Sequence, residues 1–339
     1  RTVKLVKQHH NRDIDLDAIP LDCPEVYTRL SQGDTAGVFQ MESNLYRDLL
    51  RQIQPTNIHD LVAILALGRP GPMDRIKDYA QRKKQQQQVT YLHPALEPIL
   101  RDTYGIMIYQ EQVMRIAMDL AGYTPGQADS LRRGMGKKMP ELIAAEKERF
   151  IKGAVAKGID EKIAEAIFQD MEKFAGYGFN LSHSAAYALI SYQTAYLKEH
   201  YPIEFMAACL SSVMGSTDRV VSYVQSCERM GIPVLPPDIN QSHVDFTPVD
   251  GAIRFGLGAV KNVGTKAAWG IVQRRDKPFT SLLDFCKRVP SELCNRSALE
   301  SLIKAGAFDG LGPSRAAMLQ VLPDVLAMAE QDKRREASM

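Results

Sequence analysis

The chain has 339 residues, of which 45% are hydrophobic and 24% charged, and its formal net charge is +2. This length is enough for two domains with a core each, and a charge so close to zero does not by itself indicate a nucleic-acid-binding protein. No apolar run approaches the roughly eighteen residues of a membrane helix, and five cysteines without C-x-x-C spacing argue against a disulfide framework or structural zinc, so a reducing cytoplasm is expected.

The first 35 residues are polar and rich in aspartate and proline, which is typical of a connector. Asp13, Asp15 and Asp17 alternate as they would at the start of a calcium-binding loop. Ala18 stands where such a loop needs a glycine, and its closing glutamate is also missing, so we reject a calcium site.

From Thr35 to about Ser212 the sequence shows mainly helical periodicity. One helix should end at the string R-P-G-P-M (69–73), because proline cannot continue it. The low-complexity run R-K-K-Q-Q-Q-Q (82–88) is too polar for a core and predicts an exposed loop. Amphipathic helices are expected over 142–150 and 163–174.

A basic string follows, L-R-R-G-M-G-K-K, whose cations are Arg132, Arg133, Lys137 and Lys138. Arginine can donate two parallel hydrogen bonds to a phosphate, lysine adds a compact charge, and the two intervening glycines let the backbone approach an anion. The string therefore predicts a polyphosphate or nucleic-acid backbone site. The alternative is a solvated basic helix end.

Residues 184–201 predict a helix that ends before Pro202. We expect its buried stripe to consist of Ala186, Leu189, Ile190, Gln193 and Leu197. The opposite face, expected to be wet, carries His183, Tyr187, Ser191, Thr194 and Lys198. The turn G-Y-G-F-N just before this helix directs aromatic and hydrogen-bonding groups toward the helix N-terminus.

Beyond residue 232, a proline-rich stretch and a hairpin predicted to turn at Asp250-Gly251 indicate a smaller α+β segment. Two similar strings follow, V-G-T-K-A-A (263–268) and L-G-P-S-R-A-A (311–317). Each has an apolar-Gly turn, a cation and two alanines that open a helix. Unpaired N–H groups at a helix start can hold a phosphate, so the pair predicts a tandem helix-hairpin-helix unit that grips duplex DNA by its backbone.

The DNA-contacting residues of this unit would be Lys261, Gly264, Lys266, Gly312 and Arg315. Four further cations fit the same interpretation, namely Arg274, Arg275, Arg288 and Arg296. The alternative is a pair of glycine-capped helices that binds no ligand.

Six strings together cover almost the whole chain: G-V-F-Q-M-E-S (37–43), A-L-G-R-P-G-P-M (66–73), T-Y-G-I-M-I-Y-Q-E-Q-V-M (103–114), L-R-R-G-M-G-K-K (131–138), F-A-G-Y-G-F-N-L-S-H-S-A-A-Y-A (174–188) and L-P-P-D-I-N (235–240). In this order they resemble one family, the alpha (catalytic) subunit of bacterial replicative DNA polymerase III. The resemblance implies a mainly α fold, with a multi-helix fingers domain followed by a small α+β segment and a tandem helix-hairpin-helix unit. The implied domains are a connector from an upstream palm domain (1–35), the fingers (36–232), the hairpin and helix-hairpin-helix region (233–324) and a charged tail (325–339).

The resemblance also implies roles for single residues. The cations Arg132, Arg133, Lys137 and Lys138 would hold the triphosphate of the incoming deoxynucleotide. The surface against the nascent base pair would consist of Tyr177, Phe179, Asn180, Ser182 and His183. Arg69 would face DNA or the same pocket, and the two hairpins would hold the duplex that leaves the site.

The chemistry of this family is phosphoryl transfer by two metal ions, expected here to be Mg²⁺. The family holds them with three palm aspartates, and no residue of this chain inherits that role. The aspartates are therefore expected upstream of Arg1, so the chain alone should be inactive and the full-length protein should be a DNA-directed DNA polymerase. Expected partners are primer-template DNA, deoxynucleotide triphosphates and, in the full-length protein, a sliding clamp and other replisome subunits. The location would be a bacterial cytoplasm, with no membrane involved.

Two alternatives from other functional classes stay open. A stand-alone, non-catalytic protein derived from a polymerase would bind duplex DNA through the helix-hairpin-helix unit and would not need the nucleotide site. An adaptor for other replication proteins would bind neither nucleotide nor DNA and would expose an apolar patch.

Overall fold

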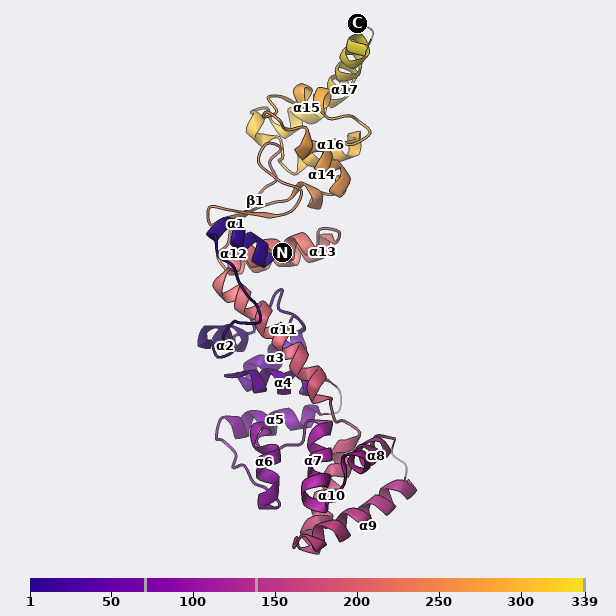
Figure 1. Ribbon diagram of the computed structural model, residues 1–339. Coiled ribbons are helices and arrows are strands. Elements are labelled where there is room, and N and C mark those ends of the chain that lie inside the picture. The colour runs from indigo at the N-terminus through magenta and orange to yellow at the C-terminus, as the bar shows by residue number, and fades with distance from the viewer. Residues whose placement is uncertain (70–71, 138–139, 338–339) are drawn as a thin grey trace. The chain divides into compact units, whose positions relative to one another are not determined.

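A computed structural model describes residues 1–69, 72–137 and 140–337 (Figure 1). These residues form mainly α-helices, with a small three-stranded sheet in the second half of the chain. The predicted fold class is thereby confirmed. No helix in this part of the chain is long and apolar enough to cross a membrane.

The chain forms two compact units, and each is described by itself. The helical unit consists of Leu16–Glu199, and the hairpin unit combines Arg1–Asp15 with His200–Met339. The first 35 residues therefore contribute helix α1 (Thr2–His10) to the hairpin unit and helix α2 (Pro24–Ser31) to the helical unit. The domain boundary expected at residue 233 stays a prediction.

The helical unit contains ten helices over its described residues. They are α2, α3 (Asn44–Ile53), α4 (Ile58–Leu67), α5 (Met73–Lys83), α6 (Glu97–Leu100), α7 (Gln110–Ala121), α8 (Pro125–Gly136), α9 (Pro140–Ala156), α10 (Glu161–Ala175) and α11 (Leu181–His200), with 3₁₀ turns η1 (Pro94–Leu96) and η2 (Arg101–Thr103). Helices α9 and α10 confirm the amphipathic helices predicted at 142–150 and 163–174.

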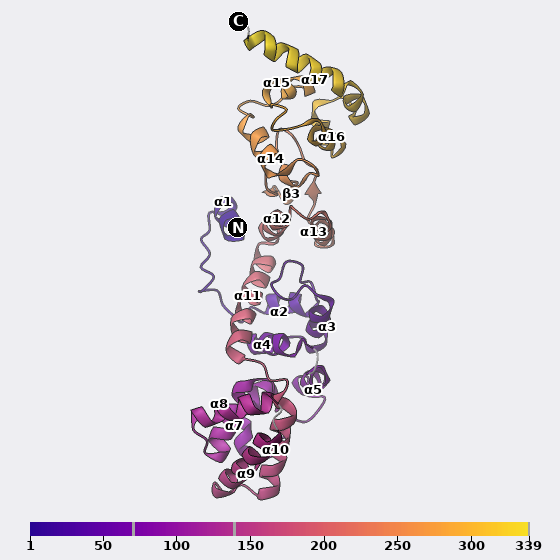
Figure 2. The ribbon, with the colours of Figure 1, turned by 90° about the vertical axis from the view of Figure 1, so that its right-hand side faces the viewer.

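Helix α4 lies in the first core of this unit, between α2, α3, α5 and α11 (Figure 2). Its sequence is apolar on all sides, as expected for a helix that is surrounded by others, and every residue from Asp60 to Leu67 is buried. Asn57 caps it by accepting a hydrogen bond from the Asp60 N–H. The helix ends before the predicted proline break, of which residues 70 and 71 lie outside the described residues.

Helices α7 to α10 lie together (Figure 2) and enclose a second core. Its fully buried rings belong to Phe150 and Phe168. A short backbone pairing joins this group to the turn before α11. The Phe179 N–H donates to the Ile108 carbonyl at 3.2 Å, and the Gln110 N–H donates to the Phe179 carbonyl at 2.9 Å. The turn G-Y-G-F-N is thereby fixed against the start of α7.

The prediction for the two faces of α11 was largely wrong. The helix itself is confirmed, but Ala186 is exposed, and so are Leu189 and Ile190, at 37% and 41%. Of the expected stripe, Leu197 alone is buried and Gln193 is half-buried. Polar residues seven positions apart are buried instead: Ser184, Ser191 and Lys198.

Hydrogen bonds to distant segments explain this reversal. The Ser184 hydroxyl donates to the Val62 carbonyl at 2.7 Å, and the Ser191 hydroxyl donates to the Phe39 carbonyl at 2.8 Å. Lys198 is bonded to the segment before α3. A buried polar group is tolerated when it has such a partner, and the two serines are small enough for close packing.

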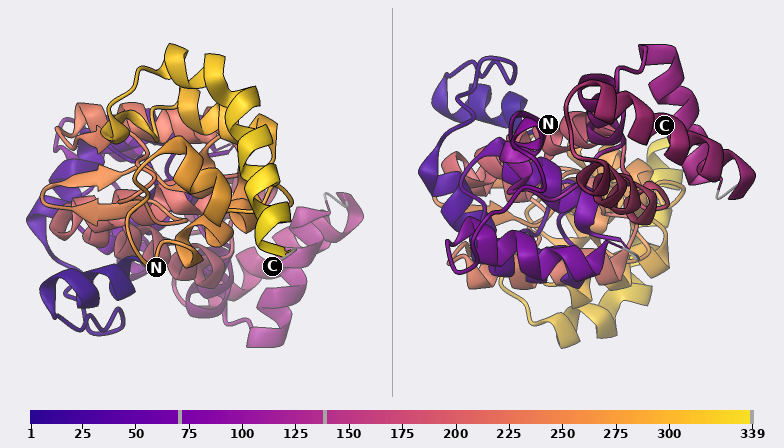
Figure 3. Two further views of the ribbon diagram at one scale, coloured as in Figure 1. Left: turned by 90° about the horizontal axis from the view of Figure 1, so that it is seen from above. Right: turned by 90° about the horizontal axis from the view of Figure 1, so that it is seen from below.

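The hairpin unit contains α1 and the remaining elements. They are α12 (Pro202–Ser212), α13 (Thr217–Arg229), β1 (Val234–Leu235), β2 (Thr247–Val249), β3 (Ala252–Arg254), η3 (Leu257–Ala259), α14 (Gly264–Gln273), α15 (Leu282–Arg288), α16 (Arg296–Lys304), η4 (Asp309–Leu311) and α17 (Arg315–Ala337). Helices α14 to α17 share one core, and α17 is the long yellow helix in the left view of Figure 3.

The predicted hairpin is confirmed. Strands β2 and β3 pair antiparallel around Asp250 and Gly251, whose φ angles of 35° and 81° fit a two-residue turn of the type that suits the twist of paired strands. Strand β1 adds parallel to β3, which gives the order β1-β3-β2.

Candidate nucleotide site and nucleic-acid interface

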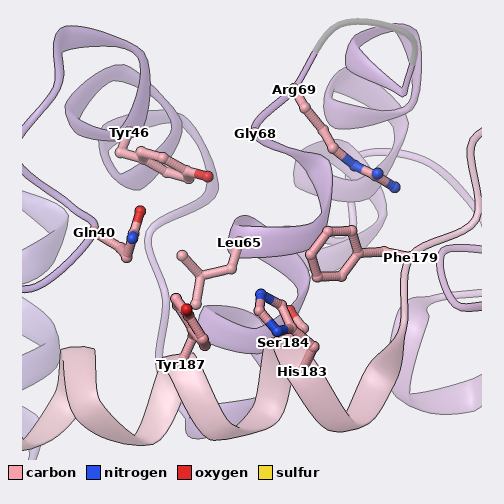
Figure 4. A pocket seen from close by; sticks show the side chains of 9 residues that line it. All are labelled: Gln40, Tyr46, Leu65, Gly68, Arg69, Phe179, His183, Ser184 and Tyr187. Atoms are coloured by element: carbon pink, nitrogen blue, oxygen red, sulfur yellow. The ribbon is translucent and has the colours of Figure 1, made fainter.

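A pocket of about 330 Å³ opens in the helical unit beside α4 and the first turns of α11 (Figure 4). Its lining brings together residues that are far apart in the sequence, among them three predicted site residues, Arg69, Phe179 and His183. The others are Gln40, Tyr46, Leu65, Gly68, Ser184 and Tyr187.

Arg69 joins the end of α4 to the turn before α11. Its guanidinium carbon lies 4.4 Å from the centre of the Phe179 ring, and its Nη2 donates to the Tyr177 carbonyl at 2.5 Å. Partial burial lowers the pKa of Arg69, but an arginine stays charged in proteins. The pocket thus contains a fixed positive charge stacked on an aromatic ring.

Gly68 allows the ring of Tyr46 to lie close to the backbone. A Cβ atom at this position would lie 2.4 Å from the ring of Tyr46, so any larger residue would push that ring away from the backbone. Figure 4 shows Tyr46 and Gln40 on one side of the pocket, across from Arg69 and Phe179.

Aromatic side chains continue along one face of α11. The rings of Phe179 and His183 are 5.5 Å apart, those of His183 and Tyr187 4.2 Å apart, and Phe39 lies 5.3 Å from Tyr187. The spacing of four residues places His183 and Tyr187 on one side of α11, between Phe179 in the preceding turn and Phe39. Flat, partly exposed rings of this kind can stack on a nucleobase.

The N-terminus of α11 is already occupied by side chains of this protein. Asn180 accepts a hydrogen bond from the His183 N–H at 2.7 Å and donates one to Glu111 at 3.0 Å. Glu111 also accepts from the Leu181 N–H at 2.9 Å. Asn180 therefore caps this helix, and its N–H groups do not form an open anion site.

The basic string lies on α8, where Asp129 pairs with both arginines. Arg132 donates to Asp129 Oδ1 at 3.0 and 2.7 Å, and Arg133 lies 2.5 Å from Oδ2. Hydrogen bonds from Arg132 and Arg133 lower the pKa of Asp129. Lys137 is exposed just after the helix, and Lys138 lies outside the described residues.

Gln110 connects the basic string to the aromatic turn. Its side-chain oxygen accepts from Arg132 at 3.1 Å, and its side-chain nitrogen donates to the Gly178 carbonyl at 3.1 Å. The cations of α8 and the ring of Phe179 therefore belong to one continuous part of the helical unit.

Sequence reasoning missed three residues of this site, namely Gln110, Glu111 and Asp129. The signal for Asp129 was its position, three and four residues before the two arginines, which is the spacing of helical ion pairs. Gln110 and Glu111 lie within one of the six family strings, but only the fold shows what they contact.

The other predicted residues of this surface are more open. Tyr177 is 45% exposed and lines a separate hollow of about 760 Å³ with Met135 and Lys173. Ser182 is exposed on the first turn of α11. Among the described residues, no group of three or more His, Cys, Asp or Glu side chains could hold a metal ion, so the implied Mg²⁺ has no ligand set there.

The first hairpin of the hairpin unit lies just before α14. Gly264 has a φ of +69° and nearby Asn262 has +67°, left-handed values that allow the tight turn and favour glycine. No side chain caps α14. Lys261 and Lys266 are exposed, and neither has an ion-pair partner within the described ranges.

The second hairpin differs from the first because its cation, Arg315, is paired with an acid. Gly312 is again left-handed, with a φ of +98°, but Arg315 is held by Asp309 through bonds of 2.9, 3.1 and 2.5 Å and by the Lys304 carbonyl at 3.1 Å. The two hairpins are therefore unequal, and only the first presents a cation that no acid neutralises.

The supporting cations also have internal partners. Arg275 donates to the carbonyls of Ile239 and Ser242, at 3.1 and 2.8 Å. Arg288 pairs with Asp284, and Arg296 with Glu300. Arg274, directly after α14, donates to the Gly270 carbonyl of that helix. Their contribution to a basic surface is correspondingly smaller than composition indicated.

Comparison with known proteins finds two matching families. Residues 1–158 match the bacterial DNA polymerase III alpha subunit finger domain, and residues 231–318 match the helix-hairpin-helix motif.

Similar curated proteins carry the name DNA polymerase III subunit alpha. The one from Thermus aquaticus is 47% identical over 342 residues, covering 99% of this chain and 28% of the relative. Those from Xylella fastidiosa (strain Temecula1) and Escherichia coli (strain K12) are 48% and 47% identical over 99% and 96% of this chain, and 29% of each relative. The chain thus spans under a third of the length of these relatives.

Proposed function

This chain is related to the finger and helix-hairpin-helix regions of the bacterial DNA polymerase III alpha subunit, and we propose that it serves a DNA-directed DNA polymerase by holding substrates. In this proposal the helical unit binds the incoming deoxynucleotide triphosphate beside the nascent base pair. The hairpin unit holds the duplex.

The single observation that carries the nucleotide role is the connection through Gln110. It links Arg132 to the turn that presents Phe179, which supports the proposal that cations for the phosphates and a ring for stacking act together. A triphosphate carries more charge than one carboxylate, so it can displace Asp129 from Arg133, which is 67% exposed. Further contacts with the nucleotide are proposed for Lys137, Lys138, Tyr177, Asn180, Ser182 and His183.

The proposed duplex contacts centre on the first hairpin, through Lys261, Gly264 and Lys266. Gly312 and Arg315 of the second hairpin would add a weaker contact, because Asp309 neutralises Arg315. Backbone contacts of this kind position a duplex without reading its sequence.

Catalysis is proposed for the whole protein and not for the described residues. No described residue is proposed as a ligand of Mg²⁺, and we derive no step through the metal. The 339-residue chain alone is expected not to extend a primer. Contacts with a sliding clamp and other replisome subunits are likewise proposed for the whole protein.

The test compares two arginines in matched settings. Arg133 and Arg101 are 67% and 68% exposed, and each pairs with an acid four residues earlier, Asp129 and Glu97. With primer-template DNA present, Arg133→Ala should weaken the binding of a labelled deoxynucleotide triphosphate about tenfold, measured by equilibrium dialysis. Arg101→Ala should leave it unchanged.

Two outcomes would contradict the nucleotide role. One is equal loss in both variants, and the other is no nucleotide binding by the unaltered chain. If duplex binding persisted in the second case, the chain would act as a non-catalytic duplex-DNA-binding protein.

A further inference from the structure

The chain has one tryptophan, Trp269, and it is 54% exposed in the middle of α14. Its neighbours Ala268, Gly270 and Ile271 are all buried. A Cβ atom at Gly270 would lie 2.9 Å from Leu293, so this side of α14 packs closely on the chain beside it. Trp269 therefore stands on the face of α14 that is turned to solvent.

The two copies of the repeat differ in which residues they bury. In the second similar string, the residue that corresponds to Trp269 is Met318, three positions after the cation, and it is 3% exposed. The two copies bury different faces of their helices, since Ala267 and Ala268 are buried whereas Ala316 and Ala317 are exposed, and the first copy leaves its indole turned to solvent. More than half of this side chain is exposed, so its flat face and its N–H are accessible to another molecule.

The chemistry of the same face indicates which molecule. Lys266 precedes Trp269 by three residues and Gln273 follows it by four, so their side chains neighbour the indole on the helix surface. Thr265, Lys266 and Gln273 are exposed, and α14 contains no acidic residue. A cation without an ion-pair partner, two neutral polar groups and an aromatic ring form a surface that complements a polyanion.

We propose that Trp269 contacts duplex DNA directly, beside the backbone contact of the first hairpin. The flat indole would pack against the sugars of the strand that Lys266 holds, and its N–H would donate to a phosphate oxygen. This inference rests on the proposed duplex-binding role of the hairpin unit and adds a residue that the hairpin pattern does not include.

The test uses the whole chain, whose single tryptophan makes its fluorescence specific to this site. A blunt-ended duplex labelled with fluorescein reports binding by anisotropy, while the tryptophan emission is recorded in a parallel titration with unlabelled duplex. We expect the emission to change and to saturate at the same duplex concentration as the anisotropy.

Substitution separates this contact from the charge contacts. Trp269→Ala should weaken duplex binding roughly tenfold without altering its dependence on salt, because a neutral side chain releases no counterion. Trp269→Phe should recover part of the loss. The melting temperature should stay unchanged, because the ring is largely exposed.

A control variant has its single tryptophan at a different position of the hairpin unit. Val221 on α13 is 48% exposed, so the double variant Trp269→Phe, Val221→Trp keeps a single exposed tryptophan away from α14. Its emission should not follow duplex binding.

The outcomes distinguish the inference from the function on which it rests. Saturable anisotropy with unchanged tryptophan emission and unchanged affinity in Trp269→Ala would overturn the inference. No anisotropy change even at low salt would overturn the duplex-binding role itself.

Discussion

Lys198 is fully buried, and its Nζ donates a hydrogen bond to Oδ1 of Asp34 at 2.7 Å. The same ammonium group donates to the carbonyls of Asp34 and Ala36, at 3.2 and 3.1 Å, so all three of its donors are used. Asp34 also pairs with Arg29, which in turn pairs with Glu199. This network fixes α11 to the segment before α3, and α11 carries the aromatic rings of the candidate site.

We predict that Lys198→Met destabilises the chain by about 2–4 kcal/mol, because it leaves Asp34 with Arg29 as its remaining ion-pair partner and removes the buried donor to the carbonyls of Asp34 and Ala36. Methionine keeps most of the stem volume, so the change reports mainly on the charge. Urea unfolding measures it. In Lys152→Met, which removes an exposed pair with Glu148, the loss should stay below about 1 kcal/mol. Equal losses in the two variants would show that burial is not the cause.

The same network predicts a loss of stability in acid. Burial opposes the ionisation of Asp34, but Lys198 and Arg29 outweigh it and lower its pKa from the ordinary 3.8. A group whose pKa is lower in the folded state stabilises the fold above its unfolded pKa, and this contribution is lost as the pH falls through the folded pKa. The free energy of unfolding should therefore fall below about pH 4, and Asp34→Asn should make that fall shallower. An unchanged slope in the variant would contradict the assignment.

Arg69 should depend on its shape as well as its charge. It stacks on Phe179 and holds the Tyr177 carbonyl, and a lysine has neither the planar surface nor the fork for both contacts. We expect Arg69→Lys to weaken nucleotide binding on primer-template DNA nearly as much as Arg69→Ala, by roughly fivefold. If Arg69→Lys bound the nucleotide with unchanged affinity in the same assay, the positive charge of Arg69 would be sufficient for binding.

The two hairpins should differ in their dependence on salt. Lys266→Ala should flatten the slope of duplex affinity against salt by roughly one unit, because it removes one cation that is free to bind a phosphate. Arg315→Ala should flatten it clearly less, since Asp309 already neutralises that arginine. Anisotropy titrations at several salt concentrations measure both slopes. Equal slopes for the two variants would mean that Asp309 releases Arg315 when the duplex binds.

Features that depend on residues close together in the chain could be predicted from the sequence alone. It predicted the hairpin at Asp250-Gly251, because this turn needs residues that tolerate a positive φ, and it located the ends of α4 and α11 through the prolines that follow them. The family strings indicated the same relationship that comparison with known proteins finds.

Which face of α11 is covered depends on contacts with distant segments of the chain. Periodicity shows that Leu189 and Ile190 lie on a different side from Ser191 and Lys198, and apolarity favoured the wrong side. The polar side is buried because backbone carbonyls and a carboxylate from residues 34–62 satisfy it, and no local pattern contains those distant partners. The candidate site depends on the same kind of long-range contact, since Gln110 joins Arg132 to a turn almost 70 residues further along the chain.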